Sequence, residues 1–332
     1  LEVLSTITAE SPETPVIVVS GVSLLDYAVQ ALKRGAWDYV TKPIHDMAVL
    51  ESAVRRGIEH AELLRQNREY RENLEILNRE LTQTLKQLQE DEEAGRSIQF
   101  QLLPEDNCSF GSYTFRRRLY PSMYLSGDFV DYFPIDDRHA GFYMADVSGH
   151  GAASAFVTVM LNTLVVQYRD ALWQSGDDTI LHPERTLQRL NRNLCRQNLD
   201  KHLTMFYGVI DLEQNSMHYS NGGQFPYPLQ YDGREVRSLE CRGRPLGLFD
   251  DAEFRVWQCD LPQKYVLVLV SDGILELMPE ETMLQRYRAL LTDMEDAKLD
   301  LDEMTAGLDV LADKHLPDDI AFLVISRSQT DG

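Results

Sequence analysis

The stretch Gly141-Phe-Tyr-Met-Ala-Asp-Val-Ser-Gly-His-Gly151 decides the fold of the larger part of this chain. Its first five residues, 141–145, form an apolar run of the kind that predicts a buried β-strand. The run ends on Asp146 and passes directly into a glycine turn. A carboxylate that closes a hydrophobic strand is costly to desolvate unless it is paired or bound to a cation. The stretch therefore predicts a strand that carries an acidic group to a site.

Three further acidic positions share this setting, at the end of an apolar run or in a glycine turn: Ser126-Gly-Asp128-Phe129, Val270-Ser-Asp272-Gly273 and Pro317-Asp318-Asp319-Ile320. Most of the 53 acidic residues are solvated surface, and a lone Asp-Gly is usually a turn. Four such positions without lysine or arginine at the strand ends indicate shared cations instead. Hard carboxylate oxygens select Mg²⁺ or Mn²⁺, and the sequence has no His/Cys cluster that would suggest zinc. Two such ions activate water and hold a phosphoryl group.

The segment from about residue 94 to the end is long enough for a complete domain. Strand-like runs, such as 141–145 and 265–270, alternate there with helical segments at 152–168 and 183–198. This order predicts an α+β domain rather than a parallel sheet.

The first 44 residues follow a different pattern. A β-branched run at 15–20 predicts a strand, apolar residues at helical spacing follow at 24–32, and a second strand is predicted at 37–41. Gly35 stands where a helix C-cap is expected. This β-α-β order is the unit of a parallel, doubly wound sheet.

The segment from 48 to 91 contains no proline and predicts one long helix. Its heptad seam consists of Leu63, Asn67, Tyr70, Leu74, Leu77, Leu81, Thr84 and Leu88. One interpretation is a coiled coil that forms a homodimer and relays a signal. The other is a single amphipathic helix that packs on its own chain. We expect the dimer, because the flanks offer such a helix little else to bury against.

The formal net charge of −21 argues against nucleic acid and against an anionic membrane surface as partners. The four cysteines form no C-x-x-C pair and are expected to be buried reduced thiols. The longest apolar run, 265–270, is far too short to cross a membrane, and no signal peptide opens the chain. The expected location is the cytoplasm.

The first segment resembles the second half of a response-regulator receiver domain, through Pro15-Val-Ile-Val-Val-Ser-Gly21 and the later Gly-Ala-x-Asp-Tyr-Val-x-Lys-Pro-Ile at 35–44. The resemblance implies that Ser20 is the switch hydroxyl, Tyr39 the switch aromatic and Lys42 the lysine that pairs with a phosphoryl group. It places the phospho-acceptor aspartate in a strand before Leu1, so no acceptor is named in this chain. A histidine kinase or another phosphodonor is the implied partner.

The third segment resembles the SpoIIE/RsbU-type branch of the metal-dependent protein phosphatases, which implies an antiparallel β-sandwich flanked by helices. Seven motifs carry the likeness: Ile98-Gln-x-x-Leu-Leu-Pro104, Ser126-Gly-Asp-Phe-Val-Asp131, Asp146-Val-Ser-Gly-His-Gly151, Tyr219-Ser-Asn-Gly-Gly-Gln-Phe-Pro226, Gly243-Arg-Pro-Leu-Gly247, Ser271-Asp-Gly-Ile-Leu-Glu276 and Asp318-Asp-Ile-Ala321. Ser126, Gln224 and Ala321 depart from the family pattern, and Gln224 is expected to alter substrate contact.

The same resemblance implies that two Mn²⁺ or Mg²⁺ are held by four catalytic carboxylates and the Val147 carbonyl: Asp128, Asp146, Asp272 and Asp318. Asp131 and Asp319 are expected behind these ligands. His150 is expected to shape the glycine turn, with general acid catalysis as the alternative.

Receiver, helix and phosphatase together resemble the RssB-type response regulators. This implies a serine/threonine phosphatase acting on a phosphorylated anti-sigma-factor antagonist, with a sigma factor as a possible partner. The alternative is an adaptor that holds a sigma factor or its antagonist; retention of all four aspartates favours catalysis. The expected domains are a partial receiver at 1–47, a coiled-coil linker at 48–93 and the phosphatase at 94–332.

Overall fold

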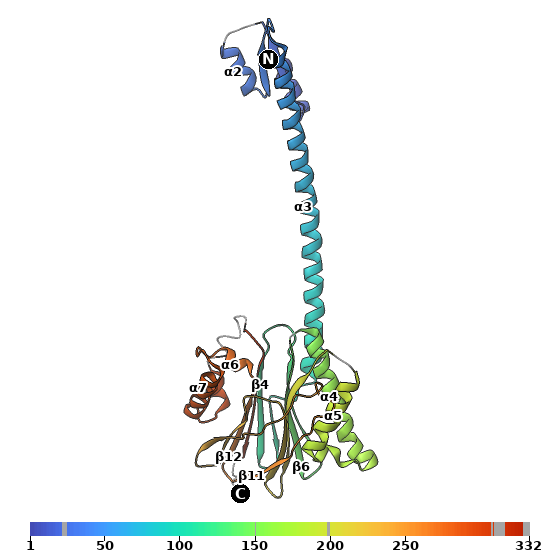
Figure 1. Ribbon diagram of the computed structural model, residues 1–332, viewed down its shortest axis with the longest axis vertical. Helices are drawn as coiled ribbons and strands as arrows, with labels where there is room; N and C mark the ends of the chain where they lie inside the picture. Colours follow the sequence, from blue (N-terminus) through green and yellow to red (C-terminus); the bar gives the residue numbers. More distant parts are fainter. Residues whose placement is uncertain (22–24, 150, 198–199, 307, 309–315, 328–332) are drawn as a thin grey trace. The chain divides into compact units, whose positions relative to one another are not determined.

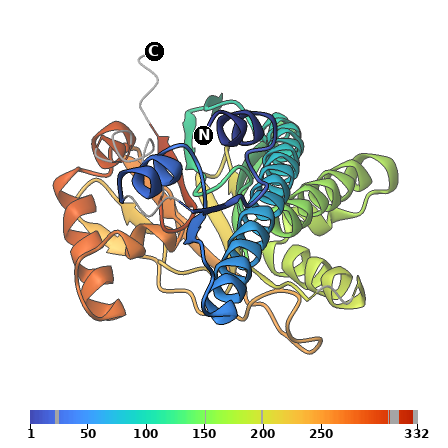
Figure 2. The same ribbon diagram turned by 90° about the horizontal axis from the view of Figure 1, so that it is seen from above.

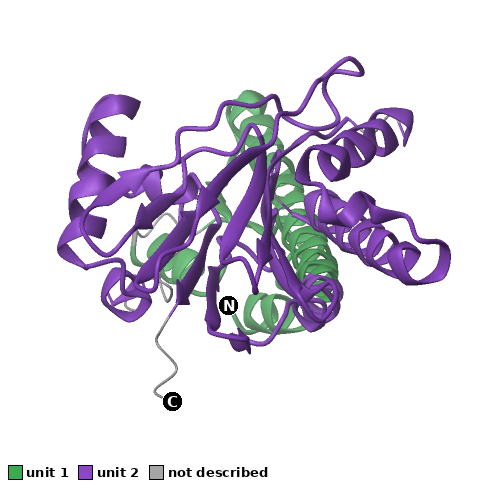
Figure 3. Ribbon diagram, turned by 90° about the horizontal axis from the view of Figure 1, so that it is seen from below, with its two compact units in different colours: residues 1–88 green, residues 89–332 purple. Residues whose placement is uncertain are grey.

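The computed structural model describes residues 1–21, 25–149, 151–197, 200–306, 308 and 316–327 (Figure 1). The chain divides into two compact units, residues 1–88 and residues 89–332, which Figure 3 shows in separate colours. One helix, α3 (Met47–Gln101), contributes residues to both units. Each unit is therefore described by itself.

The first unit is a small α/β layer. It consists of α1 (Glu2–Glu10), β1 (Ile17–Ser20), α2 (Leu25–Lys33), β2 (Asp38–Thr41) and the N-terminal part of α3. The two strands are parallel and α2 connects them, so the predicted β-α-β order is confirmed. Helix α1 was not predicted from the sequence, because its serine, threonines and isoleucine have modest helix propensity. Its Leu4 packs against Ala31 and Ala36, and this tertiary contact accounts for its position.

The receiver residues named from the sequence lie on or beside these strands. Ser20 ends β1 and is paired with Thr41, and the Lys42 backbone N–H donates to the Ser20 carbonyl at 2.8 Å. Ser20 and Lys42 therefore both lie at the carboxyl end of the two parallel strands. Tyr39 lies one strand position earlier and packs against the small core around Ala31.

Helix α3 has 55 residues and extends beyond the predicted 48–91 segment at its C-terminal end. Its first turns pack on the unit 1 sheet, where Ala53 is fully buried. Every residue of the predicted heptad seam is exposed, including Leu74 at 64% and Leu81 at 58%. The chain therefore presents a helical apolar seam that its own described residues do not cover. None of the helices in the described part of the chain is both long and apolar enough to span a membrane.

The second unit is built on two antiparallel sheets. The six-stranded sheet has the order β10-β9-β12-β13-β4-β3 and the five-stranded sheet has the order β11-β8-β7-β6-β5. Their strands are β3 (Asn107–Phe110), β4 (Tyr113–Tyr120), β5 (Asp128–Pro134), β6 (His139–Val147), β7 (Leu203–Asp211), β8 (Ser216–Gly222), β9 (Leu229–Tyr231), β10 (Val236–Ser238), β11 (Trp257–Asp260), β12 (Tyr265–Val270) and β13 (Ile320–Arg327). The helical elements are α4 (Ala152–Ser175), η1 (Asp178–Leu181), α5 (Pro183–Gln197), α6 (Gly273–Glu276), α7 (Met283–Asp296) and α8 (Leu301–Thr305).

The two sheets form the middle of a four-layer sandwich. One core lies between the sheets, a second between the five-stranded sheet and helices α4 and α5, and a third between the six-stranded sheet and helices α6 to α8. Figure 2 shows α4 and α5 side by side, with α7 across the sandwich from them. The predicted α+β fold with a helix-flanked β-sandwich is confirmed by this arrangement.

The position of strand β6 between two cores explains why its sequence is apolar without alternation. Phe142 and Met144 enter the core between the sheets, whereas Tyr143 and Ala145 enter the core under α4 and α5. Successive side chains of a strand point to opposite faces. Because both faces of β6 are covered, no polar side chain occurs in this strand between His139 and Asp146.

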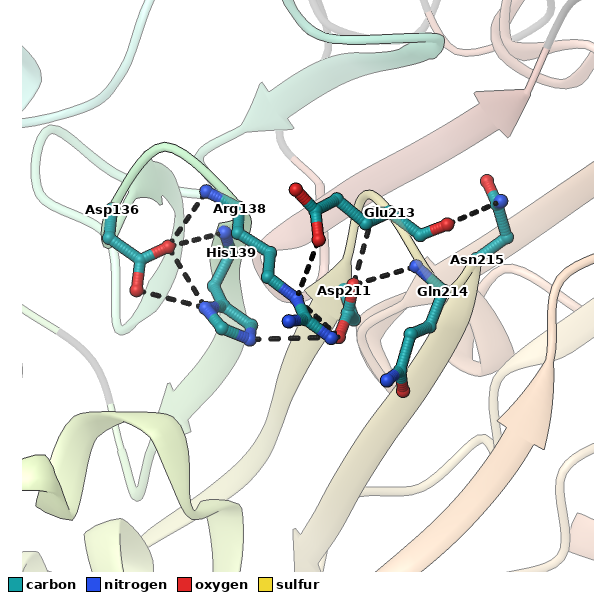
Figure 4. A network of polar contacts seen from close by, with 7 residues as sticks. All are labelled: Asp136, Arg138, His139, Asp211, Glu213, Gln214 and Asn215. Carbon is teal, nitrogen blue, oxygen red and sulfur yellow. Dashed lines mark hydrogen bonds and ion pairs between the residues drawn. The ribbon is translucent and has the colours of Figure 1, made fainter.

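A polar cluster joins the turns at one end of the five-stranded sheet (Figure 4). The Arg138 guanidinium donates two hydrogen bonds to Oδ2 of Asp211, at 2.6 and 2.9 Å. His139 contacts Asp136 through Nδ1 at 2.9 Å, and its Nε2 lies 3.8 Å from Asp211. These contacts tie the β5–β6 turn to the β7–β8 turn, at the opposite strand ends from Asp128 and Asp146.

Candidate metal centre

The predicted carboxylates come together at one end of the sandwich. Asp128 begins β5, Asp146 is the penultimate residue of β6, and the two are direct partners across the antiparallel pair. Asp272 follows β12 and precedes α6, and Asp318 lies just before β13. Strands β12 and β13 are also paired, and Ser271 N–H donates to the Ala321 carbonyl at 3.1 Å. Each sheet therefore supplies two aspartates to the same end of the domain.

A pocket of about 380 Å³ opens at this point. Its lining includes Asp146, Asp272 and Asp318, together with His202 and Thr204 at the start of β7. Asp128 is not one of the lining residues; it is the direct strand partner of Asp146, and only 2% of its surface is exposed. The pocket is therefore acidic, and a buried carboxylate is paired with one of its lining residues.

The protonation behaviour of these groups reflects crowding of like charge. Burial, followed by the charge of Asp146, raises the pKa of Asp128 well above its ordinary value. Burial, followed by Asp272 and Asp318, raises the pKa of Asp146 to about 7. Asp272 keeps part of its surface open to solvent, yet its partial burial and then Asp318 raise its pKa too. Negative groups that are driven together in this way favour a bound cation.

The residues present fit a divalent ion in two further respects. Oδ2 of Asp128 is buried and has no hydrogen-bond partner among the described residues, which is costly for a carboxylate without a cation. A Cβ on Gly127 would lie 2.9 Å from the Val147 carbonyl oxygen, so glycine keeps open the space beside the predicted backbone ligand. Among the described residues, however, no three Asp, Glu, His or Cys side chains converge closely enough to hold an ion by themselves. Backbone carbonyls and water would have to complete the coordination.

Asp319 holds the loop before Asp128 through hydrogen bonds. Its Oδ1 accepts from the Ser122 N–H and hydroxyl at 2.7 and 2.9 Å, and its Oδ2 accepts from the Gly127 N–H at 2.7 Å. With 5% of its surface exposed and both oxygens engaged, Asp319 fixes the backbone that leads into Asp128.

Asp131 lies elsewhere. It is three residues after Asp128 on β5, so its side chain projects from the opposite face of the strand. It contacts Asn162 of α4, whose Nδ2 lies 3.2 Å from Oδ2 of Asp131. Burial in that helix-facing layer raises the pKa of Asp131 to about 7. The structure does not bring Asp131 into the pocket.

Gln224 is not one of the residues that line the pocket. Gln224 is buried: its Oε1 accepts from the Thr204 hydroxyl at 3.1 Å, and its Nε2 lies 3.4 Å from the Val270 carbonyl. It therefore reaches the pocket only through Thr204. His150 lies outside the described residues.

Gln99, in the last turns of α3, is a contact that sequence reasoning missed. Its Nε2 donates to the Ser126 carbonyl at 2.7 Å and to the Thr158 hydroxyl at 2.9 Å, and its Oε1 accepts from the Ser126 N–H at 3.1 Å. The Ser126 hydroxyl in turn accepts from the Asp128 N–H at 3.1 Å. The long helix thus ends in direct contact with the loop that carries a predicted ligand. The available signal was a glutamine among apolar residues in the Ile98–Pro104 motif.

Comparison with known proteins gives two family matches. The model of the Stage II sporulation protein E (SpoIIE) family matches residues 136–328, and that of the response regulator receiver domain matches residues 1–55.

Individual relatives agree with these matches. The phosphoserine phosphatase RsbU of Bacillus subtilis (strain 168) is 29% identical over 215 residues, which are 62% of this chain and 61% of that protein. The phosphoserine phosphatase RsbP of the same organism is 30% identical over 157 residues, 46% of this chain and 37% of that protein. The chain thus spans less than two thirds of either relative. The SiaA-PP2C domain of Pseudomonas aeruginosa shares the fold, with a TM-score of 0.59 and 19% identity over 74% of this chain and 99% of that one.

Proposed function

Because the chain belongs to the Stage II sporulation protein E (SpoIIE) family, we propose that it is a metal-dependent protein serine/threonine phosphatase controlled by its receiver segment. The observation that carries the proposal is that Asp146, Asp272 and Asp318 line one acidic pocket. Asp128 is the direct strand partner of Asp146, and its buried Oδ2 has no hydrogen-bond partner among the described residues. The names of RsbU and RsbP, both phosphoserine phosphatases, support the class of substrate.

The four aspartates and the Val147 carbonyl would hold two Mn²⁺ or Mg²⁺. Such ions, when bound, polarise a phosphoryl oxygen and make water nucleophilic at neutral pH. The chain itself supplies the positioning. Asp319 and Gln99 fix the loop before Asp128, and Gly127 keeps the space beside Val147 open. The pocket of about 380 Å³ accepts a phosphorylated side chain at the surface of a protein.

We infer that the substrate is a phosphorylated antagonist of an anti-sigma factor. The relatedness to RsbU and RsbP supports this choice, as does the retention of all four aspartates. The adaptor function, in which the domain holds a sigma factor or its antagonist without turnover, is the outcome that absence of both metal binding and hydrolysis would favour.

The receiver segment and α3 supply the input in this proposal. Ser20 and Lys42 lie at the carboxyl end of the two parallel strands, as a site that responds to a phosphodonor requires. We propose that the exposed seam of α3 pairs two chains into a homodimer, because its leucines, such as Leu74 and Leu81, would otherwise remain in water. The assignment of residues 1–47, 48–93 and 94–332 to receiver, linker and phosphatase is part of the same proposal.

The test is hydrolysis of an aryl phosphate, and then of a phosphoserine peptide, by the full chain with Mn²⁺ and with EDTA. We expect turnover with Mn²⁺ and none with EDTA. Absence of turnover together with absence of Mn²⁺ binding in calorimetry would contradict the enzyme assignment. Turnover that persists in EDTA would contradict the metal centre.

A further inference from the structure

Helix α5 has one strongly basic face. Its apolar side is buried under the five-stranded sheet through Leu187, Leu190 and Leu194. The other side carries four exposed arginines at spacings of four, three and four residues, which places them on one face of the helix: Arg185, Arg189, Arg192 and Arg196. We call these residues the arginine face.

The arginine face borders a groove of about 710 Å³ between α4 and α5. Tyr168 of α4 and Phe254 contribute an aromatic floor. The guanidinium of Arg189 lies 4.6 Å from the centre of the Tyr168 ring, and the Tyr168 hydroxyl accepts from Nδ2 of Asn193 at 2.7 Å. The groove therefore has an aromatic base and a rim that carries the four arginines and one acidic residue, Glu184.

The four guanidiniums are not equally engaged. Arg189 forms an ion pair with Asp177 at 2.5 Å, and Arg185 lies 3.3 Å from Asp178. Arg192 and Arg196 form no ion pair with any residue that the structure describes. Arg185 and Arg189 hold η1 against α5 through these ion pairs. Arg192 and Arg196 have no such structural role among the described residues. Two positive charges thus face solvent at the C-terminal half of α5.

The buried side of that half of α5, opposite the arginine face, is linked by one loop to the lining of the acidic pocket. A Cβ on Gly247 would lie 3.4 Å from Cβ of Leu194 and 3.7 Å from Cα of His202, so one loop contacts both α5 and the pocket lining. The Gly247 N–H also donates to Asn191 of α5 at 2.8 Å. The twelve residues from Arg185 to Arg196 cover about 16 Å along a helix, the length of roughly five extended residues.

We propose that the arginine face is a docking groove for an acidic, extended segment of the protein substrate. The inference rests on the proposed function, which identifies the bound molecule as a protein substrate. The recognition itself is ion pairing between guanidiniums and carboxylates. A chain of net charge −21 repels an acidic partner as a whole. A local row of guanidiniums on the exposed side of α5 offsets that repulsion and orients the segment by ion pairing.

The test uses the full chain and a fluorescent peptide with one phosphoserine flanked by glutamates, compared with the same peptide carrying glutamines. Binding is measured by fluorescence anisotropy in EDTA, so that no hydrolysis is needed. The variant is Arg192→Ala with Arg196→Ala. The matched control is Arg234→Ala with Arg288→Ala, two exposed arginines from the β9–β10 turn and α7 that change the net charge equally.

We expect the α5 double variant to bind the glutamate peptide about three- to tenfold more weakly than the wild type, as two exposed charge contacts predict. We expect the control to bind like the wild type, and the glutamine peptide to bind both variants equally. Aryl phosphate turnover with Mn²⁺ should be unchanged in the α5 variant. Equal affinity of wild type and α5 variant for the glutamate peptide would overturn the docking groove, as would an equal loss in the control. Loss of peptide binding in a protein without turnover would support the groove while refuting the proposed enzyme.

Discussion

Replacing Gln99 by alanine removes the contact between the end of α3 and the loop that carries Asp128. Only 2% of Gln99 is exposed, and its amide satisfies both the N–H and the carbonyl of Ser126. A buried polar group that loses its partner costs about 1–3 kcal/mol. Two such groups, allowing for some rearrangement or entry of water, predict a loss of about 2–4 kcal/mol in the free energy of unfolding.

The same change should weaken metal binding, because Ser126 also holds the Asp128 N–H. Urea unfolding followed by tryptophan fluorescence gives the stability, and calorimetric titration with Mn²⁺ gives the affinity. Gln101→Ala is the matched control, since Gln101 ends the same helix and is exposed. If Gln99→Ala unfolds within about 0.5 kcal/mol of the control, the size of ordinary surface substitutions, and binds Mn²⁺ equally well, then the proposed coupling between α3 and the site is refuted.

Three other predictions concern the site, the helix and the distal polar cluster. Asp272→Asn should abolish Mn²⁺-dependent turnover while leaving the urea midpoint nearly unchanged, because Asp272 is exposed and packs little; retained turnover with bound Mn²⁺ would contradict its assignment. Leu74→Lys with Leu81→Lys should convert a dimer into a monomer in sedimentation of the full chain, and a monomeric wild type would remove the coiled-coil proposal. Burial alone would raise the pKa of Asp211, but the Arg138 hydrogen bond and the Gln214 N–H outweigh it and lower this pKa. The stability from this lowered pKa is present above the unfolded-state value of about 3.9 and is lost as the pH falls through the folded-state value, so Arg138→Gln should flatten the decline of Tm below about pH 4. An unchanged acid profile would show that the pair does not stabilise the fold.

Sequence patterns predicted those elements whose residues all lie in one kind of surroundings, such as a strand that is buried on both faces. The apolar run that ends at Asp146 became the central strand β6, and the carboxylates at or beside strand ends lie at one end of the domain because the ends of paired strands meet. Motif spacing was a weaker guide to side-chain direction. Asp131 shares a motif with Asp128, yet an interval of three residues along a strand turns it toward α4.

Contacts made over long sequence distances were beyond the reach of pattern analysis. Gln99 and Ser126 are separated by 27 positions, and neither their spacing nor their type indicates that they meet. Helix α1 likewise depends on Leu4 reaching Ala31 and Ala36. In both cases the tertiary contact selects the local arrangement, and local propensity does not reveal it.

The complete enclosure of β6 has a consequence for hydrogen exchange. The strand is paired on both edges, with β5 and β7, and is covered on both faces, so its central amides have no local route to solvent. Their deuterium uptake should require opening of the whole sandwich. The amides of residues 122–127, which lie in a loop, should exchange through smaller openings. A ligand that slows only the loop therefore acts locally, whereas one that also slows β6 stabilises the entire domain, and a single exchange experiment distinguishes the two.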